Sequence, residues 1–157
     1  MVQIDDLSRI IDEHPFAHGM DDTLRALIVG CAANERYDAG QYVLREGGRA
    51  DKFFLIRAGA VALEIASPSG AIMVETLSDG DLLGWSWLSD PPVWTFDARA
   101  TQLTRVISFD ANCLRRKMDA DPALGYEVLR RFLPIMAHRI HAARMQMLDL
   151  YGPGPRR

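Results

Sequence analysis

The sequence predicts a mainly β domain, in which an eight-stranded antiparallel jelly-roll barrel is preceded by helices and followed by a long helix. Between residues 36 and 109, short segments rich in valine, isoleucine and phenylalanine are separated by glycine or Pro-Ser-Gly turns, which is typical of a closed or nearly closed β-sheet. Apolar residues recur with helical spacing on both sides of this region. The chain has 157 residues, 48% of them hydrophobic and 25% charged, so we expect a single domain over residues 1–157.

Helices are expected over residues 4–33. Two apolar faces with helical spacing lie in this region, and Pro15 separates them. Asp21 or Asp22 is positioned to cap the second helix. The first face consists of Leu7, Ile10 and Ile11, and the second of Leu24, Leu27, Ile28 and Cys31.

The barrel is predicted over residues 36–109, where the apolar period changes to two. Glycines mark the turns between its strands, because tight turns need positive φ or close backbone approach. The clearest strand segments are 42–44, 52–57, 61–65, 71–77, 94–100 and 105–109.

Two further helices are predicted over residues 110–119 and 122–151. The second carries an apolar stripe whose members alternate by three and four residues, the spacing of a coiled-coil seam. Its first two turns are expected to pack on the barrel. Beyond Met136 a helix rising about 1.5 Å per residue outruns so small a barrel, so we expect a second copy of the helix to cover the stripe. Pro134 removes one backbone donor and is a candidate kink. The stripe begins at Tyr126 and continues through the candidate dimer residues Leu129, Leu133, Met136, Ile140, Ala143, Met147 and Leu150.

Composition indicates the compartment and excludes some partners. The formal net charge of -3 and the pI near 5.8 provide no overall attraction to nucleic acid or to an anionic membrane. Cys31 and Cys113 are too few for a disulfide framework or a metal cluster, so both are predicted to be reduced and buried as small hydrophobic residues. The N-terminus lacks a secretion signal, and no run approaches the roughly 20 apolar residues of a membrane span. We therefore predict a cytoplasmic protein.

Residues 37–61 combine several turn and strand features. They include Gly40, an Arg-Glu-Gly turn at residues 45–47 and a Phe-Leu-Ile-x-x-Gly-x-Val strand pair at residues 54–61. With the order of the surrounding elements, this combination resembles the cyclic nucleotide-binding domain of the catabolite-activator and anaerobic-regulator (Crp/Fnr-like) superfamily, over roughly residues 22–150. The resemblance implies a non-catalytic regulatory domain.

In that family a short loop, the phosphate-binding cassette, reads Gly-Glu-x-x-x-Leu followed by an arginine. The glutamate holds the ribose hydroxyl, and the arginine and backbone N–H groups hold the phosphate. On this sequence the glycine matches Gly84 and the leucine matches Leu88, whereas Trp85 takes the glutamate position and Trp94 the arginine position. Each charge-assisted hydrogen bond contributes on the order of 1.5 to 3 kcal/mol, so losing both side chains lowers affinity by about two to four orders of magnitude. Ordinary cyclic AMP or cyclic GMP binding is therefore not expected, and no cofactor is predicted.

The aromatic residues of this loop leave three interpretations open. They fill the cavity of a ligand-free domain, line a remodelled pocket for an apolar or aromatic ligand, or form a patch for a protein partner. Arg99 is the nearest downstream cation and would reach a phosphate only if a bulge turned it inward, and Arg45 and Arg49 are weaker alternatives. The candidate ligand-binding residues are Val61, Val74, Gly84, Trp85, Ser86, Leu88, Trp94 and Thr95.

Two other function classes find little support. Metal enzymes with a cupin-like double-stranded β-helix need histidine and carboxylate ligands inside the barrel, yet the four histidines, at positions 14, 18, 138 and 141, lie outside it. No nucleophile elbow or phosphate-binding P-loop is present in the sequence. Only residues 152–157 follow the long helix, so a winged helix-turn-helix for DNA is not expected if the chain is complete.

We therefore predict a regulatory sensor domain that dimerises through its last helix and responds to a small ligand or a protein partner. The alternative is a ligand-free domain that acts as a homodimeric interaction module. A nucleotide-sized pocket between Val61, Val74 and Gly84 would support the sensor, whereas tryptophan side chains filling that space would support the module.

Overall fold

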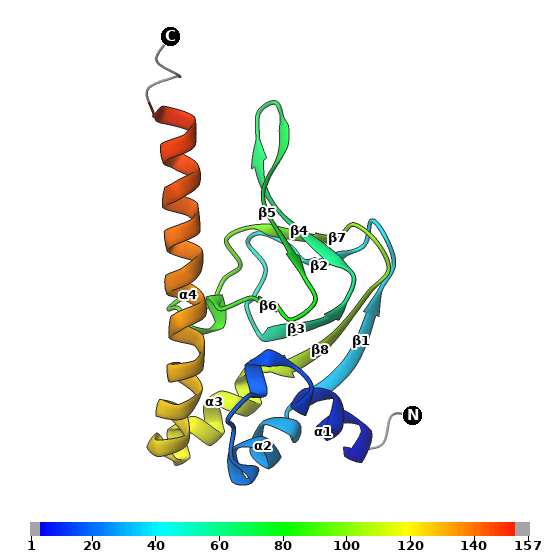
Figure 1. Ribbon diagram of the computed structural model, residues 1–157, viewed down its shortest axis with the longest axis vertical. Helices are drawn as coiled ribbons and strands as arrows, with labels where there is room; N and C mark the ends of the chain where they lie inside the picture. The colour runs from blue at the N-terminus through cyan, green and yellow to red at the C-terminus, as the bar shows by residue number, and fades with distance from the viewer. Residues whose placement is uncertain (1–3, 153–157) are drawn as a thin grey trace.

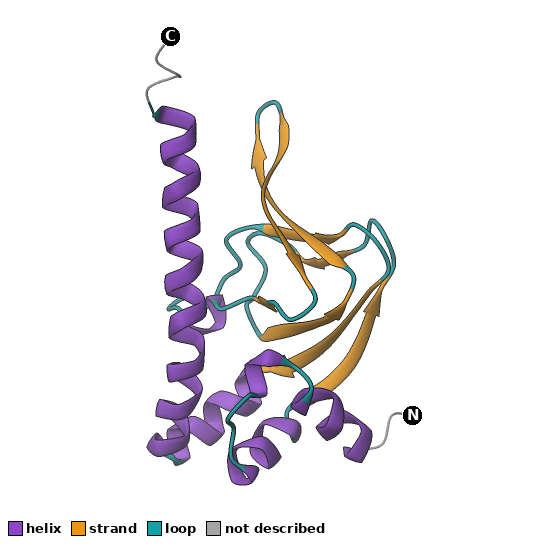
Figure 2. Cartoon of the chain, in the orientation of Figure 1, coloured by secondary structure: helices purple, strands orange, loops and turns teal. Residues whose placement is uncertain are grey.

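A computed structural model describes residues 4–152 of the chain. Two antiparallel sheets form the body, the short helices lie below it, and one long helix stands at its side (Figures 1 and 2). The elements in chain order are α1 (Ile4–Asp12), η1 (Pro15–Ala17), α2 (Asp22–Val29), β1 (Ala32–Tyr37), β2 (Tyr42–Leu44), β3 (Lys52–Ala58), β4 (Ala60–Ser67), β5 (Gly70–Ser78), β6 (Leu82–Leu83), η2 (Ser86–Leu88), β7 (Asp97–Ala100), β8 (Thr104–Asp110), α3 (Ala111–Ala120) and α4 (Pro122–Tyr151).

The eight strands confirm the predicted jelly-roll. Four of them form a sheet of order β1-β8-β3-β6, and the other four a sheet of order β2-β7-β4-β5. The barrel starts earlier than expected, because β1 begins at Ala32 and the helical lead-in ends at Val29. The predicted strand 94–100 is shortened to β7, which begins at Asp97, because the preceding residues belong to the loop after η2.

Aromatic packing joins the barrel to the long helix. Phe53 on β3 stacks on Phe109 of β8, with ring centroids 4.5 Å apart, and on Trp87 of η2 at 5.6 Å. Phe132 of α4 meets Phe53 edge-on at 5.1 Å. All four side chains are almost completely buried, so the loop after β6 and the first half of α4 share one core.

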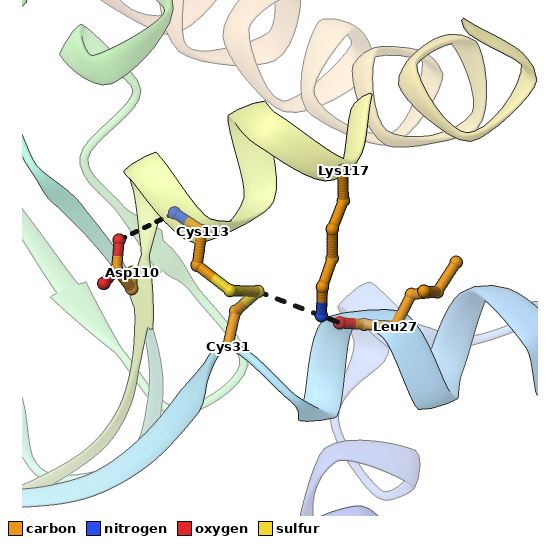
Figure 3. The surroundings of a disulfide bond; sticks show 5 residues. All are labelled: Leu27, Cys31, Asp110, Cys113 and Lys117. Atoms are coloured by element: carbon orange, nitrogen blue, oxygen red, sulfur yellow. Dashed lines mark hydrogen bonds between the residues drawn. A yellow bond between two sulfur atoms is a disulfide. The ribbon is translucent and has the colours of Figure 1, made fainter. Parts of the chain in front are cut away.

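A disulfide between Cys31 and Cys113 corrects the prediction of two reduced cysteines (Figure 3). Cys31 follows α2 and Cys113 lies in the first turn of α3, with their Cα atoms 5.8 Å apart. Around the bond, Asp110 accepts from the Cys113 amide at 2.9 Å and the Lys117 ammonium donates to the Leu27 carbonyl at 2.6 Å. The two cysteines are 82 residues apart in sequence, and only the folded chain brings them together. The cysteine argument for a reducing compartment therefore no longer applies.

The long helix α4 stands beside the two sheets and extends about as far as the tip of the β4–β5 hairpin (Figure 1). Its barrel-facing side consists of Leu124, Val128, Phe132 and Arg139, which are buried. The expectation that the first turns of the stripe pack on the barrel was wrong, because Tyr126, Leu129 and Leu133 are exposed. Pro134 lies inside the helix without ending it. Within residues 4–152, no helix combines the length and apolar character needed to cross a membrane.

Candidate functional site

The loop between β6 and β7 occupies the place where the sequence predicts the cassette. It begins at Gly84, whose φ of +87° lies in the left-handed region that favours glycine. One turn of 3-10 helix, η2, follows, and Trp87 in that turn is completely buried. The buried indole anchors the loop in the aromatic core. The Arg115 guanidinium of α3 strengthens this anchor by donating a hydrogen bond to the Trp87 carbonyl.

Trp94 fills the space beside Gly84. A Cβ atom placed on Gly84 would lie 2.8 Å from Cη2 of the Trp94 ring, which leaves no room for even a methyl group. The other edge of the indole lies over Gly48, where an added Cβ would be 3.4 Å from Cδ1. The Trp94 side chain is accordingly buried, with 6% of the residue exposed. The indole thus occupies the position at which the family pattern has an arginine.

Backbone hydrogen bonds hold Trp94 in this position. Its amide donates to the Gly48 carbonyl, and its carbonyl accepts from the Gly47 amide, both at 2.9 Å. Ala50 donates to the Pro92 carbonyl at 2.8 Å. The second half of the loop is therefore tied to the turn between β2 and β3, which belongs to the motif of residues 37–61.

Trp85 links the loop to α4. The Arg139 guanidinium carbon lies 4.8 Å from the centroid of the half-buried Trp85 ring, a cation–π distance. Arg139 also donates to the Leu82 carbonyl of β6, and its Nε lies 3.7 Å from a Glu75 carboxylate oxygen. Burial lowers the pKa of Arg139, and the charges of Glu75 and Asp81 act in the opposite direction. Arg139, which is buried on the long helix and paired with a carboxylate, therefore contacts Trp85, the residue at the family's glutamate position.

Sequence reasoning did not identify Arg139 as part of this region. A signal was present, because Arg139 follows Phe132 by seven residues and Val128 by eleven, which places all three on one helix face. The predicted apolar stripe lies on a different face of the helix.

The remaining candidate residues are not all brought together. Val61 is fully buried on the inner face of β4, and Ser86 is buried in η2. Leu88 is half-buried, and Thr95 is exposed. Val74 lies at the bulge of β5, between the residues paired with Leu63 and Glu64, and is exposed on the β4–β5 hairpin.

Arg99 does not point into the barrel. Strand β7 pairs with β4 without a register shift over residues 97–100, so the bulge needed to turn Arg99 inward does not occur. Its neighbours Ala98 and Ala100 are buried, and the Arg99 guanidinium donates to the Glu64 carboxylate at 2.5 and 3.1 Å. These bonds raise the pKa of Arg99. The side chain is thus already paired on the outer face of the sheet.

Side chains that could bind a metal ion are not grouped among the described residues. Among the residues that the structure describes, no group of three or more histidine, cysteine, aspartate or glutamate side chains is close enough to hold a metal ion.

Comparison with known families matches residues 34–121 to the cyclic nucleotide-binding domain. A structure from Geobacter metallireducens GS-15, named as a cyclic nucleotide-binding protein, superposes with a TM-score of 0.76 at 24% identity, covering 90% of this chain and 100% of that chain. The Thermus thermophilus catabolite activator protein gives 0.67 at 20% identity, covering 87% and 62%. The regulatory subunit of a cAMP-independent protein kinase A from Trypanosoma brucei gives 0.69 at 16% identity, covering 90% and 51%.

Proposed function

Because the chain belongs to the cyclic nucleotide-binding domain family, we propose that it is a non-catalytic regulatory domain whose cassette does not bind cyclic AMP or cyclic GMP in the usual way. The observation that carries this proposal is the Trp94 indole packed against Gly84. An arginine at this position would contribute a charge-assisted bond to a phosphate, whereas the indole offers neither a positive charge nor open space.

The missing glutamate is also expected to lower nucleotide affinity. Trp85 replaces the glutamate that would accept from a ribose hydroxyl, and its ring is engaged by Arg139. Together the two replacements are expected to lower nucleotide affinity by about two to four orders of magnitude.

We also propose that the loop is coupled to α4. Trp87 meets Phe132 edge-on at 5.4 Å, and Trp85 meets Arg139, so two side chains of the loop contact the buried helix face at positions about two turns apart. A change in the packing of this loop would therefore change the seating of α4. The loop serves in this proposal as a mechanical link to the helix.

Dimerisation through α4 completes the proposal. The stripe leaves large apolar side chains in solvent, including Leu133 at 67% and Ile140 at 51% exposure. Apolar side chains in heptad spacing on one helix pair most simply with the same stripe on a second copy. The packed cassette and this open stripe favour the homodimeric interaction module over a sensor with a remodelled pocket. The same fold occurs in a kinase regulatory subunit described as cAMP-independent, so the fold alone does not imply a response to cyclic AMP.

Thermal unfolding with cyclic AMP and cyclic GMP at millimolar concentration tests the cassette. We expect no change in the midpoint of the natural protein. A ligand present at 100 times its Kd stabilises by about 2.7 kcal/mol, so a shift of several degrees with either nucleotide would overturn the proposal.

The double variant Trp85→Glu, Trp94→Arg provides the matched comparison. It restores both charges of the family pattern, and we expect it to gain a nucleotide-dependent shift that the natural protein lacks. Isothermal titration of the natural protein with both nucleotides decides the question if the variant does not unfold cooperatively.

A further inference from the structure

A lysine ammonium group lies beside the Cys31–Cys113 disulfide (Figure 3). The Nζ of Lys117 donates to the Leu27 carbonyl at 2.6 Å, and the Sγ of Cys31 lies 3.8 Å from the same oxygen. The ammonium and this sulfur are therefore no more than about 6.4 Å apart, which is the sum of the two distances. No carboxylate within residues 4–152 forms a salt bridge with Lys117. The positive charge beside Cys31 is thus not paired with an acidic side chain.

Gly30 leaves the space that this ammonium occupies. A Cβ atom placed on Gly30 would lie 3.0 Å from the Nζ of Lys117, which is tighter than nine in ten real Cβ contacts. The φ of -63° at Gly30 is ordinary right-handed helical backbone, so the conformation does not require glycine. The packing of the ammonium next to Cys31 accounts for the missing side chain.

Cys113 is the more exposed of the two cysteines and belongs to the first turn of a helix. Asp110 is the N-cap of α3, and Cys113 is the third residue of that helix. Cys113 is half-buried, whereas only 8% of Cys31 is exposed. A helix N-terminus and a neighbouring ammonium both stabilise a thiolate. The Asp110 carboxylate accepts from the Cys113 amide at 2.9 Å and offsets part of the helix charge, so the stronger cationic influence acts on Cys31.

These surroundings favour one direction of thiol–disulfide exchange. The exchange is faster when the attacked sulfur can be reached and when the departing sulfur is stabilised as a thiolate. Cys113 is the residue that solvent reaches, and Cys31 is the residue whose thiolate would have an ammonium beside it. A disulfide in purely apolar surroundings has neither advantage.

We propose that Cys31–Cys113 is a redox-active disulfide that accepts two electrons from a dithiol reductant while the domain stays folded. A thiolate of the reductant attacks the Sγ of Cys113 and forms a mixed disulfide, and the electron pair of the broken S–S bond leaves on the Sγ of Cys31. The second thiolate of the reductant then displaces Cys113. The reductant becomes a disulfide, and its two protons end on the two protein thiols. The site lies outside the cassette, and the inference does not depend on the proposed function.

Other contacts hold the two cysteines near each other once the bond is open. The Asp110 amide donates to the Cys31 carbonyl at 2.8 Å, and Lys117 still ties α3 to the Leu27 carbonyl of α2. The two thiols therefore stay in position for a disulfide oxidant to re-form the bond. Arg115, two residues after Cys113, donates to the Trp87 carbonyl, so the bond opens and closes next to the contact between α3 and the loop after β6.

Reduction by dithiothreitol tests the site in the natural protein. The reaction would be run at neutral pH, stopped with excess N-ethylmaleimide and followed by mass spectrometry, once with folded protein and once with protein unfolded in urea. We expect the folded protein to be reduced at least as fast as the unfolded chain, because only the folded chain places Lys117 beside Cys31. Slower reduction of the folded protein would overturn the proposal.

Two variants assign the effect to the ammonium. Lys117→Met is expected to slow the reduction of the folded protein about threefold or more, whereas Arg116→Met, at an exposed neighbouring position, is expected to leave the rate unchanged. If Lys117 only tied α3 to α2, its removal would loosen the surroundings of the bond and speed the reduction. An unchanged or faster rate in Lys117→Met would therefore contradict the proposal. If that variant fails to fold, the comparison of folded and unfolded natural protein decides the question.

Discussion

Removal of the disulfide should strongly lower the free energy of unfolding, because the bond closes a very long loop. Cys31 and Cys113 are 82 residues apart, and the chain-entropy relation assigns a loop of this length about 15 cal/mol/K, or about 4.5 kcal/mol at 25 °C. For a domain of this size, 1 kcal/mol corresponds to roughly 2 to 4 °C in the unfolding midpoint. We therefore expect Cys31→Ala, Cys113→Ala to unfold at least about 9 °C below the natural protein.

The assay is thermal unfolding followed by circular dichroism, with and without a phosphine reductant. The natural protein should lose stability when the reductant is added, whereas the double alanine variant should be insensitive to it. This comparison separates the loss of the bond from any loss of packing caused by the alanines. A midpoint that changes by less than about 2 °C in the reduced natural protein would refute the reasoning, since it would mean that the bond is absent or does not restrict the unfolded chain.

The remaining predictions concern the helix, the core and pH. Ile140→Glu should give a monomer by sedimentation velocity, whereas His141→Glu, which is off the apolar stripe, should sediment like the natural protein. A dimeric Ile140→Glu protein would contradict dimerisation through the stripe. Phe132→Ala should lower the free energy of unfolding, measured in urea, by about 3 to 5 kcal/mol, because it removes one ring of the aromatic cluster. Met145→Ala, at an exposed position, should lower it by less than about 0.5 kcal/mol. Similar values for the two variants would contradict the shared core. Because the folded-state pKa of His14 is lowered, the unfolded state binds the proton more readily, so stability should fall as the pH drops below the unfolded value near 6.5. His14→Asn, which keeps a capping acceptor, should show a smaller loss between about pH 7.5 and 5.5 in urea unfolding, and an unchanged pH profile would exclude His14 as the titrating group.

Two residues hold the backbone of the loop between β6 and β7 in place. Gly84 keeps the left-handed turn that begins the loop, and Trp87 keeps the loop in the core. Neither requirement involves a ligand. Trp85 and Trp94 can therefore replace charged residues while the backbone of the loop stays anchored.

Local patterns were sufficient to predict the class of fold. The change of apolar period near residue 36 and the turn glycines indicated eight strands between helices, because both features depend on neighbouring residues. The Arg-Glu-Gly motif contributed to the family resemblance. The resemblance to the family predicts the cassette and its two substituted positions. The apolar stripe on α4 was also visible, although the side of the helix that packs on the barrel was assigned incorrectly for its first turns.

Features that join distant parts of the chain could not be obtained from local patterns. The Cys31–Cys113 bond depends on where α3 lies against the end of α2, and the Arg139–Trp85 contact depends on how α4 crosses the loop. Spacing along the chain predicts which residues share a face of one element, but it does not contain the distance between two elements. Period and turn chemistry therefore suffice for the strands and helices, whereas the disulfide and the Arg139–Trp85 contact follow from packing that brings together residues far apart in sequence.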